Sequence, residues 1–153
     1  MKSYPPTTGD APEYSALETI LDYSFQNPEL LARALTHSSS TADKQLDNER
    51  LEFFGDAILD FVVCEHLFHA HPLRREGELT EVKSAVVRRS TLGAAARRLG
   101  VRPFLRLGRG IAQRKKLPNS IFANVFEALV AAIYLDGGYA PVRRFVLQHL
   151  GTD

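Results

Sequence analysis

The chain has 153 residues, of which 44% are hydrophobic and 24% charged, with a formal net charge of +1, a composition typical of one soluble globular domain. No apolar run approaches the ~20 residues that span a bilayer, and the N-terminal segment lacks the apolar stretch of a signal peptide, so we expect no membrane partner. The single cysteine, Cys64, excludes an intrachain disulfide and a multi-cysteine zinc site, which favours a cytoplasmic location.

Nearly every periodic segment of the chain predicts a helix. Residues 1–14 hold three of the eight prolines and little that could pack, so we expect a flexible tail there. Asn27 and Pro28 form a helix start, with Asn as the N-cap and Pro in the first turn. Helices are expected over residues 16–23, 28–37, 49–69, 80–89, 90–99, 119–135 and 141–150. Either Asn119 or Ser120 is expected to cap the helix that ends at residue 135. Because no useful strand alternation appears, the sequence predicts one all-α domain over residues 15–150.

Charge is distributed unevenly along the chain. The segment 82–126 contains no Asp or Glu, yet it holds 11 of the 19 basic residues. Such a separation suggests an anionic partner for the middle of the chain. A set of solvated helix faces explains a basic run equally well, so charge alone does not decide between the two interpretations.

Within the helix expected over residues 49–69, the segment 48–63 carries four carboxylates, Glu49, Glu52, Asp56 and Asp60. At about 100° per residue they share a stripe about 80° wide. The other positions of this segment are almost all apolar, which is typical of a largely buried helix. Cys64, which follows it, is expected to be a small buried hydrophobe rather than a nucleophile. Carboxylates crowded in such a place repel one another unless they are protonated, paired or bound to cations. Oxygen ligands favour Mg²⁺ or Mn²⁺, and pairing with internal basic side chains remains the alternative.

A second acidic element lies in the apolar helix expected over residues 119–135. Glu127 is one of only three acids that follow Lys83 in the chain. Asn124 precedes Glu127 by one turn, and its amide oxygen can also bind a hard cation. Two apolar helices that each carry oxygen ligands at helical spacing could therefore face each other across a cation site.

Four segments of the chain resemble segments of a known protein family. The run NERLEFFGDAILD (48–60) closely resembles the ribonuclease III signature, and the resemblance continues in order through FQNPELLARALTHSS (25–39), REGELTEVKSAVVRRSTLG (75–93) and ANVFEALVAAIYLDGG (123–138). It covers roughly residues 16–150 and is far more specific than a lone short motif. It implies the ribonuclease III endonuclease-domain fold, a helical homodimer, and cleavage of double-stranded RNA in RNA processing, such as maturation of rRNA and mRNA.

The resemblance also implies roles for the acidic residues. Glu52, Asn124 and Glu127 become ligands of Mg²⁺, with Mn²⁺ as a possible substitute, and the cation would support phosphodiester hydrolysis. Asp56 is expected to position ligands or the attacking water, and Glu49 to support the site from outside. Glu76, in the REG segment, matches an auxiliary acid that lies near the metal site in some members of the family.

The resemblance also suggests roles for basic and aromatic residues. Lys83, Arg88 and Arg89 are candidates for phosphate contact, since A-form RNA is recognised mainly by its shape and backbone. The bulky neighbours Phe53 and Phe54 are candidates for the dimer contact. A place in the core is an equally good interpretation for at least one of these two phenylalanines.

The sequence departs from the family pattern in two respects. Asn124 stands where the family ordinarily has Asp, which removes one negative charge and should lower metal affinity. The chain also stops at Asp153, where the usual member continues into a double-stranded-RNA-binding domain, so we expect no such domain in this chain. Asn124 keeps open an alternative function, that of a non-catalytic RNA-binding scaffold within a ribonucleoprotein.

Overall fold

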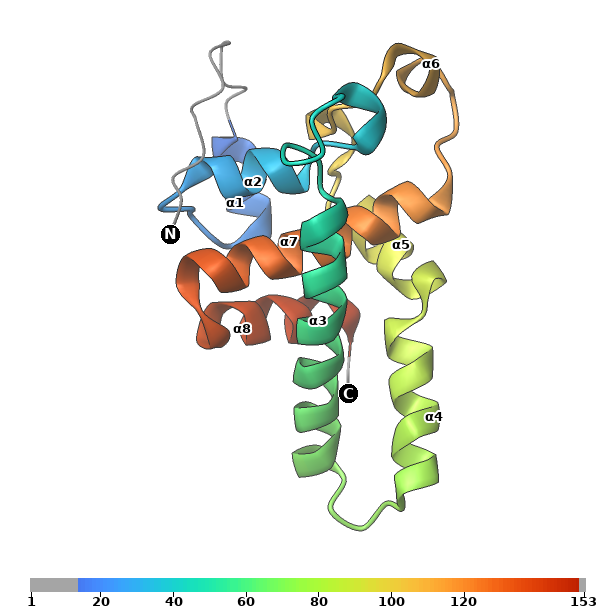
Figure 1. The fold of residues 1–153 in the computed structure, drawn as a ribbon. Coiled ribbons are helices and arrows are strands. Elements are labelled where there is room, and N and C mark those ends of the chain that lie inside the picture. Colours follow the sequence, from blue (N-terminus) through green and yellow to red (C-terminus); the bar gives the residue numbers. More distant parts are fainter. Residues whose placement is uncertain (1–13, 152–153) are drawn as a thin grey trace.

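The computed structural model describes residues 14–151, and this part of the chain is helical (Figure 1). Its elements are α1 (Ser15–Leu21), α2 (Pro28–Ala34), η1 (Ser38–Ser40), α3 (Glu49–Ala70), α4 (Glu76–Val87), α5 (Arg89–Arg98), η2 (Arg102–Phe104), α6 (Arg109–Ala112), α7 (Asn119–Gly137) and α8 (Tyr139–Leu150). Across residues 14–151 no strand forms, and the only β-type pairing is an isolated bridge between Thr36 and Arg106. The predicted all-α class is confirmed.

Helix α7 forms the centre of the core. It packs against α2, α3, α5 and α8, and α3 crosses it while α8 runs beside it (Figure 1). By length and composition α7 could cross a membrane, contrary to the expectation that no apolar run is long enough, but 67% of its most apolar stretch is buried inside the protein. The burial of most of α7 in the core explains its apolar composition without a membrane.

The crossing of α3 over α7 depends on Gly55. A Cβ atom placed on Gly55 would lie 1.8 Å from the backbone oxygen of Glu127, which is far inside van der Waals contact. Only a residue without a side chain lets the two helices approach this closely. The approach fixes which residues of α3 lie beside Glu127, and so it sets the geometry of the acidic residues.

Asp136, near the end of α7, anchors the start of α2. Its carboxylate accepts hydrogen bonds from the Tyr23 hydroxyl (2.7 Å) and from the backbone N–H groups of Gln26 and Asn27 (both 2.9 Å). Asn27 in turn caps α2, since its side-chain oxygen accepts from the Glu29 N–H, as the sequence predicts. The loop before α2 is therefore tied to the core helix.

Two helix starts differ from the sequence prediction. Helix α4 begins at Glu76, a turn earlier than expected, because the Glu78 carboxylate accepts from the Arg75 N–H and stabilises the first turn. Asn119 does not cap α7; Pro118 occupies the N-cap position. The Asn119 side chain instead joins α7 to α5, where its Nδ2 donates to the Arg89 carbonyl oxygen (2.8 Å).

Three expectations about burial are corrected. Tyr14, assigned to the tail, is only 9% exposed, whereas the rest of the expected tail lies outside the described residues. Cys64 is exposed rather than buried. Helix α3 is not buried on all sides, because Phe53 and Phe61 are 83% and 58% exposed.

Substitution of Gly55 tests the helix crossing. Gly55→Ala forces a methyl group into the Glu127 backbone, so we expect the free energy of unfolding to fall by at least about 2 kcal/mol. Gly77→Ala in α4 is the matched control, since nothing lies within 4 Å of the added methyl group. Urea denaturation followed by circular dichroism measures both variants, and equal stabilities would contradict the close approach.

Candidate active site

An open cavity of about 550 Å³ lies where α3 crosses α7. It is lined by three carboxylates of α3, one of α7, one phenylalanine and one arginine: Glu49, Glu52, Asp56, Glu127, Phe53 and Arg89. The spacing of three and four residues along α3 places its carboxylates on one side of the helix. The structure therefore brings together four of the acids singled out by the sequence.

These carboxylates differ in burial. Glu127 is only 6% exposed, because α7 is enclosed by its neighbours, and Glu52 is half-buried. Glu49 and Asp56 are exposed, so the expectation that the whole acidic stripe is poorly hydrated is wrong. Glu49, Glu52 and Asp56 border the cavity, whereas Asp60 is half-buried and pairs with Lys83 of α4.

The buried acid has an unusual proton affinity. Burial, together with the negative charges of Asp56 and Glu52, raises the pKa of Glu127 to about 7. The pKa of Glu52 is also raised, first by burial and then by Glu49 and Asp56, while Arg89 acts in the opposite direction. Mutual repulsion of this kind is what a bound cation relieves.

Arg89 contributes the one basic group among the residues lining this cavity. Its Nη2 donates a hydrogen bond to Oδ1 of Asn124, one turn before Glu127 on α7. Asn124 is half-buried and is not among the residues that line the cavity. The hydrogen bond from Arg89 occupies its amide oxygen. The sequence drew attention to Asn124 and Arg89 separately, but not to the contact between them.

The donor set fits a hard divalent cation in its chemistry. It offers carboxylate oxygens from two packed helices, which is what Mg²⁺ and Mn²⁺ prefer, and no competing sulfur or imidazole ligand. As the side chains are placed, no group of three or more His, Cys, Asp or Glu within residues 14–151 is close enough together to hold an ion. Binding would therefore draw the side chains of Glu52 and Glu127 inward from helices that are already adjacent.

Other predicted site residues lie outside the cavity. Lys83 forms an ion pair with Asp60 (2.9 Å), which holds the pKa of that lysine above its usual range. For Asp60 the structure therefore shows the alternative that the sequence left open for the stripe, pairing with an internal basic side chain. Arg88 is exposed and donates to the Thr91 hydroxyl (3.3 Å). Glu76 is exposed in the first turn of α4, where it accepts from the Thr80 hydroxyl.

Part of the basic segment has an internal structural role. Arg97 lies over the ring of Phe122, 4.3 Å from its centroid. Arg102 donates to the carbonyl oxygens of Arg114 and Lys115, and Arg98 donates to that of His149. These arginines stabilise loops and helix ends, so the positive charge of the segment is not all available to a partner.

Several other basic side chains of the segment are exposed. The exposed ones outside those internal contacts are Arg88, Arg89, Arg109, Arg114, Lys115 and Lys116. They come from the start of α5 and from the segment around α6. The charge pattern in the sequence thus combines both interpretations, since some arginines are structural and others form a solvated basic surface.

Large apolar side chains are exposed beside the acidic cavity. Phe53 is 83% and Phe54 38% exposed, so neither belongs to the core. Phe54 makes an edge-on ring contact with Tyr134 of α7 (5.7 Å between centroids), and Phe61 lies two turns further along α3. We call Phe53, Phe54, Phe61 and Tyr134 the exposed aromatic face.

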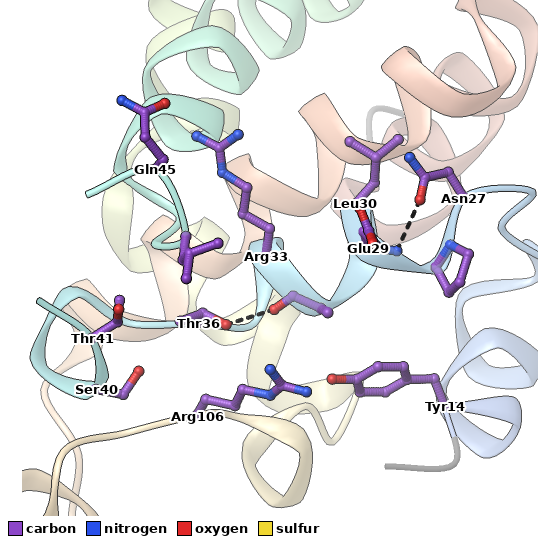
Figure 2. A pocket seen from close by; sticks show the side chains of 13 residues that line it. Tyr14, Asn27, Glu29, Leu30, Arg33, Thr36, Ser40, Thr41, Gln45 and Arg106 are labelled. Atoms are coloured by element: carbon purple, nitrogen blue, oxygen red, sulfur yellow. Dashed lines mark hydrogen bonds between the residues drawn. The ribbon is translucent and has the colours of Figure 1, made fainter. Parts of the chain in front are cut away.

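A second, largely apolar cavity of about 330 Å³ lies beside α2 (Figure 2). Arg106 and Tyr14 approach each other along one side of it, and the buried Tyr14 hydroxyl has no hydrogen-bond partner among residues 14–151. Glu29 is the only acid that lines it. This cavity shares no lining residue with the acidic cavity and has one carboxylate where the acidic cavity has four.

Comparisons with known proteins agree with the resemblance found in the sequence. Residues 27–153 match the family described as Ribonuclease-III-like. The chain is 46% identical over 126 residues to Ribonuclease 3 of Rhodopirellula baltica, covering 82% of this chain and 47% of that relative. It is 44% identical over 146 residues to Ribonuclease 3 of Geobacter sulfurreducens, covering 92% of this chain and 59% of that relative. The chain thus spans about half the length of the curated relatives it matches.

Solved structures give the same picture. The nuclease domain of ribonuclease III from Campylobacter jejuni superposes with a TM-score of 0.84 at 34% identity, covering 92% of this chain and 95% of that one. A second structure of that domain, with a TM-score of 0.83 at 33% identity, covers 91% of this chain and 99% of that one, and is described as flexible in a region involved in dimer formation. Dicer from Giardia intestinalis matches with a TM-score of 0.69 at 25% identity, covering 97% of this chain but 20% of Dicer.

The pKa of Glu127 predicts how stability depends on pH. A carboxyl group that is more basic in the folded protein than in the unfolded chain contributes stability at low pH, which is lost as pH rises through about 7. Without divalent cations, we expect Glu127→Gln to raise the free energy of unfolding at about pH 8 by on the order of 2 kcal/mol, with little effect near about pH 4.5.

Chemical denaturation across this pH range measures the effect. Glu76→Gln is the matched control, because it removes the same charge from an exposed site and should show no such pH dependence. If Glu127→Gln gave the same difference from the parent chain at every pH, the raised pKa of Glu127 would be refuted.

Proposed function

Because the chain belongs to the Ribonuclease-III-like family, we propose that it is the nuclease domain of an endoribonuclease that hydrolyses double-stranded RNA with a divalent cation. The observation that carries the proposal is the acidic cavity, where four carboxylates from α3 and α7 share one space. A cavity that concentrates negative charge beside a core helix destabilises the fold, and such arrangements are typical of functional sites.

Mg²⁺, with Mn²⁺ as a substitute, is the proposed cofactor. Glu52 and Glu127 would hold it directly, and Asn124 would join them once its oxygen is released by Arg89. When bound, the cation supplies charge neutralisation on the phosphate and an activated water. The raised pKa of Glu127 supports this assignment, because a divalent ion favours the ionised carboxylate that the apo site disfavours.

The remaining residues would orient the reactants. Asp56, exposed at the cavity edge and adjacent in sequence to Gly55, is placed to hold a water molecule by hydrogen bonding. Glu49 lies in the first turn of α3 and would support the site from outside. Glu76 stays a candidate auxiliary acid, although within one chain it does not line the cavity.

The proposed substrate is an RNA duplex met in RNA processing, such as precursors of rRNA or mRNA, in the cytoplasm. Arg88 and Arg89, exposed at the start of α5, are proposed phosphate contacts, and Arg89 also lines the acidic cavity. Lys83 can contribute only by sharing or leaving its ion pair with Asp60. The exposed basic residues around α6 support a phosphate-centred interface, which recognises duplex shape rather than base sequence.

The exposed aromatic face supports a homodimer. Exposed aromatic rings that lie side by side on two helices are typical of an interface rather than of an isolated surface. Phe53 belongs both to this face and to the wall of the acidic cavity. A dimer formed through it would therefore set two cavities close to one two-fold axis, one for each strand of a duplex.

A non-catalytic RNA-binding scaffold is the second candidate function. The hydrogen bond between Arg89 and Asn124 favours it, since it engages an oxygen that a cation would need. The four retained carboxylates support catalysis, because a scaffold would gain nothing from their mutual repulsion. An assay of RNA cleavage distinguishes the two functions, because only the nuclease would cut the RNA.

Cleavage of a duplex RNA in the presence of Mg²⁺ tests the proposed function. We expect the parent chain to cut both strands, and Glu127→Ala to lower the rate by at least about 100-fold, because a direct ligand is lost. RNA affinity of the variant, measured by fluorescence anisotropy, should stay close to that of the parent, since the basic surface is unchanged. A parent chain that binds duplex RNA but never cleaves it, at any Mg²⁺ or Mn²⁺ concentration, would support the scaffold.

Sedimentation equilibrium tests the dimer. We expect a mass of about twice 17.1 kDa for the parent and a shift to the monomer in Phe53→Asp, because a charge is placed on the apolar interface. Leu73→Asp is the matched control: Leu73 is 96% exposed in the loop between α3 and α4, and its substitution should leave the mass unchanged. A parent chain that remains monomeric at micromolar concentration would refute the interface.

A further inference from the structure

Arg89 places a positive charge where a catalytic cation is expected. It lines the acidic cavity together with four carboxylates, and its guanidinium donates to the side-chain oxygen of Asn124. No other basic side chain is among the residues lining that cavity. A phosphate-binding arginine that only awaited RNA would have no need to lie against these acids.

The backbone of Arg89 is fixed while its side chain remains accessible. Arg89 is the first residue of α5, and its carbonyl oxygen accepts a hydrogen bond from Asn119 of α7 (2.8 Å). The side chain is exposed to solvent. A long arginine side chain on such a base can exchange between the cavity and the solvent without movement of either helix.

The charge of Arg89 acts on the same acids that would hold the cation. It opposes the repulsion among the carboxylates at Glu52 and Glu127. A divalent cation in the cavity would be repelled by the guanidinium and would compete with it for the oxygen of Asn124. Arginine and cation therefore satisfy the same set of oxygen atoms and cannot both do so fully.

We infer that Arg89 is an internal counterion that competes with the divalent cation for the acidic cavity and becomes available to RNA phosphate when the cation binds. The inference rests on the proposed function of the cavity as a cation site. Because binding equilibria are reciprocal, RNA that draws Arg89 away would in turn favour cation binding. The arginine would thus link occupation of the metal site to the presence of substrate.

Mn²⁺ binding in the absence of RNA tests the inference directly. The paramagnetic resonance signal of free Mn²⁺ reports how much of the ion is bound by the 153-residue chain. We expect Arg89→Gln to lower the Mn²⁺ midpoint by at least about threefold, because a repelling charge and a competing donor are removed. Arg88→Gln is the matched control: it removes the same charge one residue away, from a side chain that contacts Thr91 and does not line the cavity.

Arg89→Lys separates charge from other effects of substitution. It keeps the positive charge, so its Mn²⁺ midpoint should stay within about twofold of the parent. A midpoint in Arg89→Gln equal to or above that of Arg88→Gln would overturn the counterion role, as would Arg89→Lys behaving like Arg89→Gln. A parent chain that binds no Mn²⁺ would refute the proposed cation site and the inference together, whereas binding with equal midpoints would refute the role of Arg89 alone.

Discussion

The close approach of α3 and α7 at Gly55 is the constraint on which the site depends. The backbone of Gly55 lies against the backbone of Glu127, with no room for a Cβ atom between them. Residues on either side of the glycine, Glu52 one turn before it and Asp56 directly after it, therefore come to lie beside Glu127. One missing side chain thus converts two separate helical motifs into a single acidic cavity.

The close approach of α3 and α7 places carboxylates beside the core, where burial makes their negative charge unfavourable. Glu127 lies on the central helix of the core, and its carboxyl is destabilised by burial and by its acidic neighbours. The extensive apolar packing of α7 compensates for this, since nearly every other residue in its middle turns is buried. Rigid helices packed in this way hold oxygen ligands at a fixed separation, which is what a catalytic cation requires.

Much of the fold and most of the acidic site could be predicted from the sequence. The sequence reveals helix starts that have local signals, such as Asn27–Pro28, and acids that recur at helical spacing. Other features depend on partners far along the chain. Asn119, a candidate N-cap in the sequence, joins α5 to α7. Lys83, a candidate phosphate contact, pairs with Asp60. The guanidinium of Arg89 lies against Asn124. The exposure of Cys64 could not be predicted, and the sequence left two interpretations of Phe53 open, because apolar residues on a helix do not reveal which of them the rest of the chain covers.

The central claim is that the acidic cavity binds a divalent cation. A crystal structure determined with Mn²⁺, with diffraction data collected at the manganese absorption edge, tests it most directly. We expect an anomalous peak between Glu52 and Glu127, with the guanidinium of Arg89 displaced from Asn124. A cavity without such a peak at millimolar Mn²⁺, with Arg89 still hydrogen-bonded to Asn124, would contradict the account.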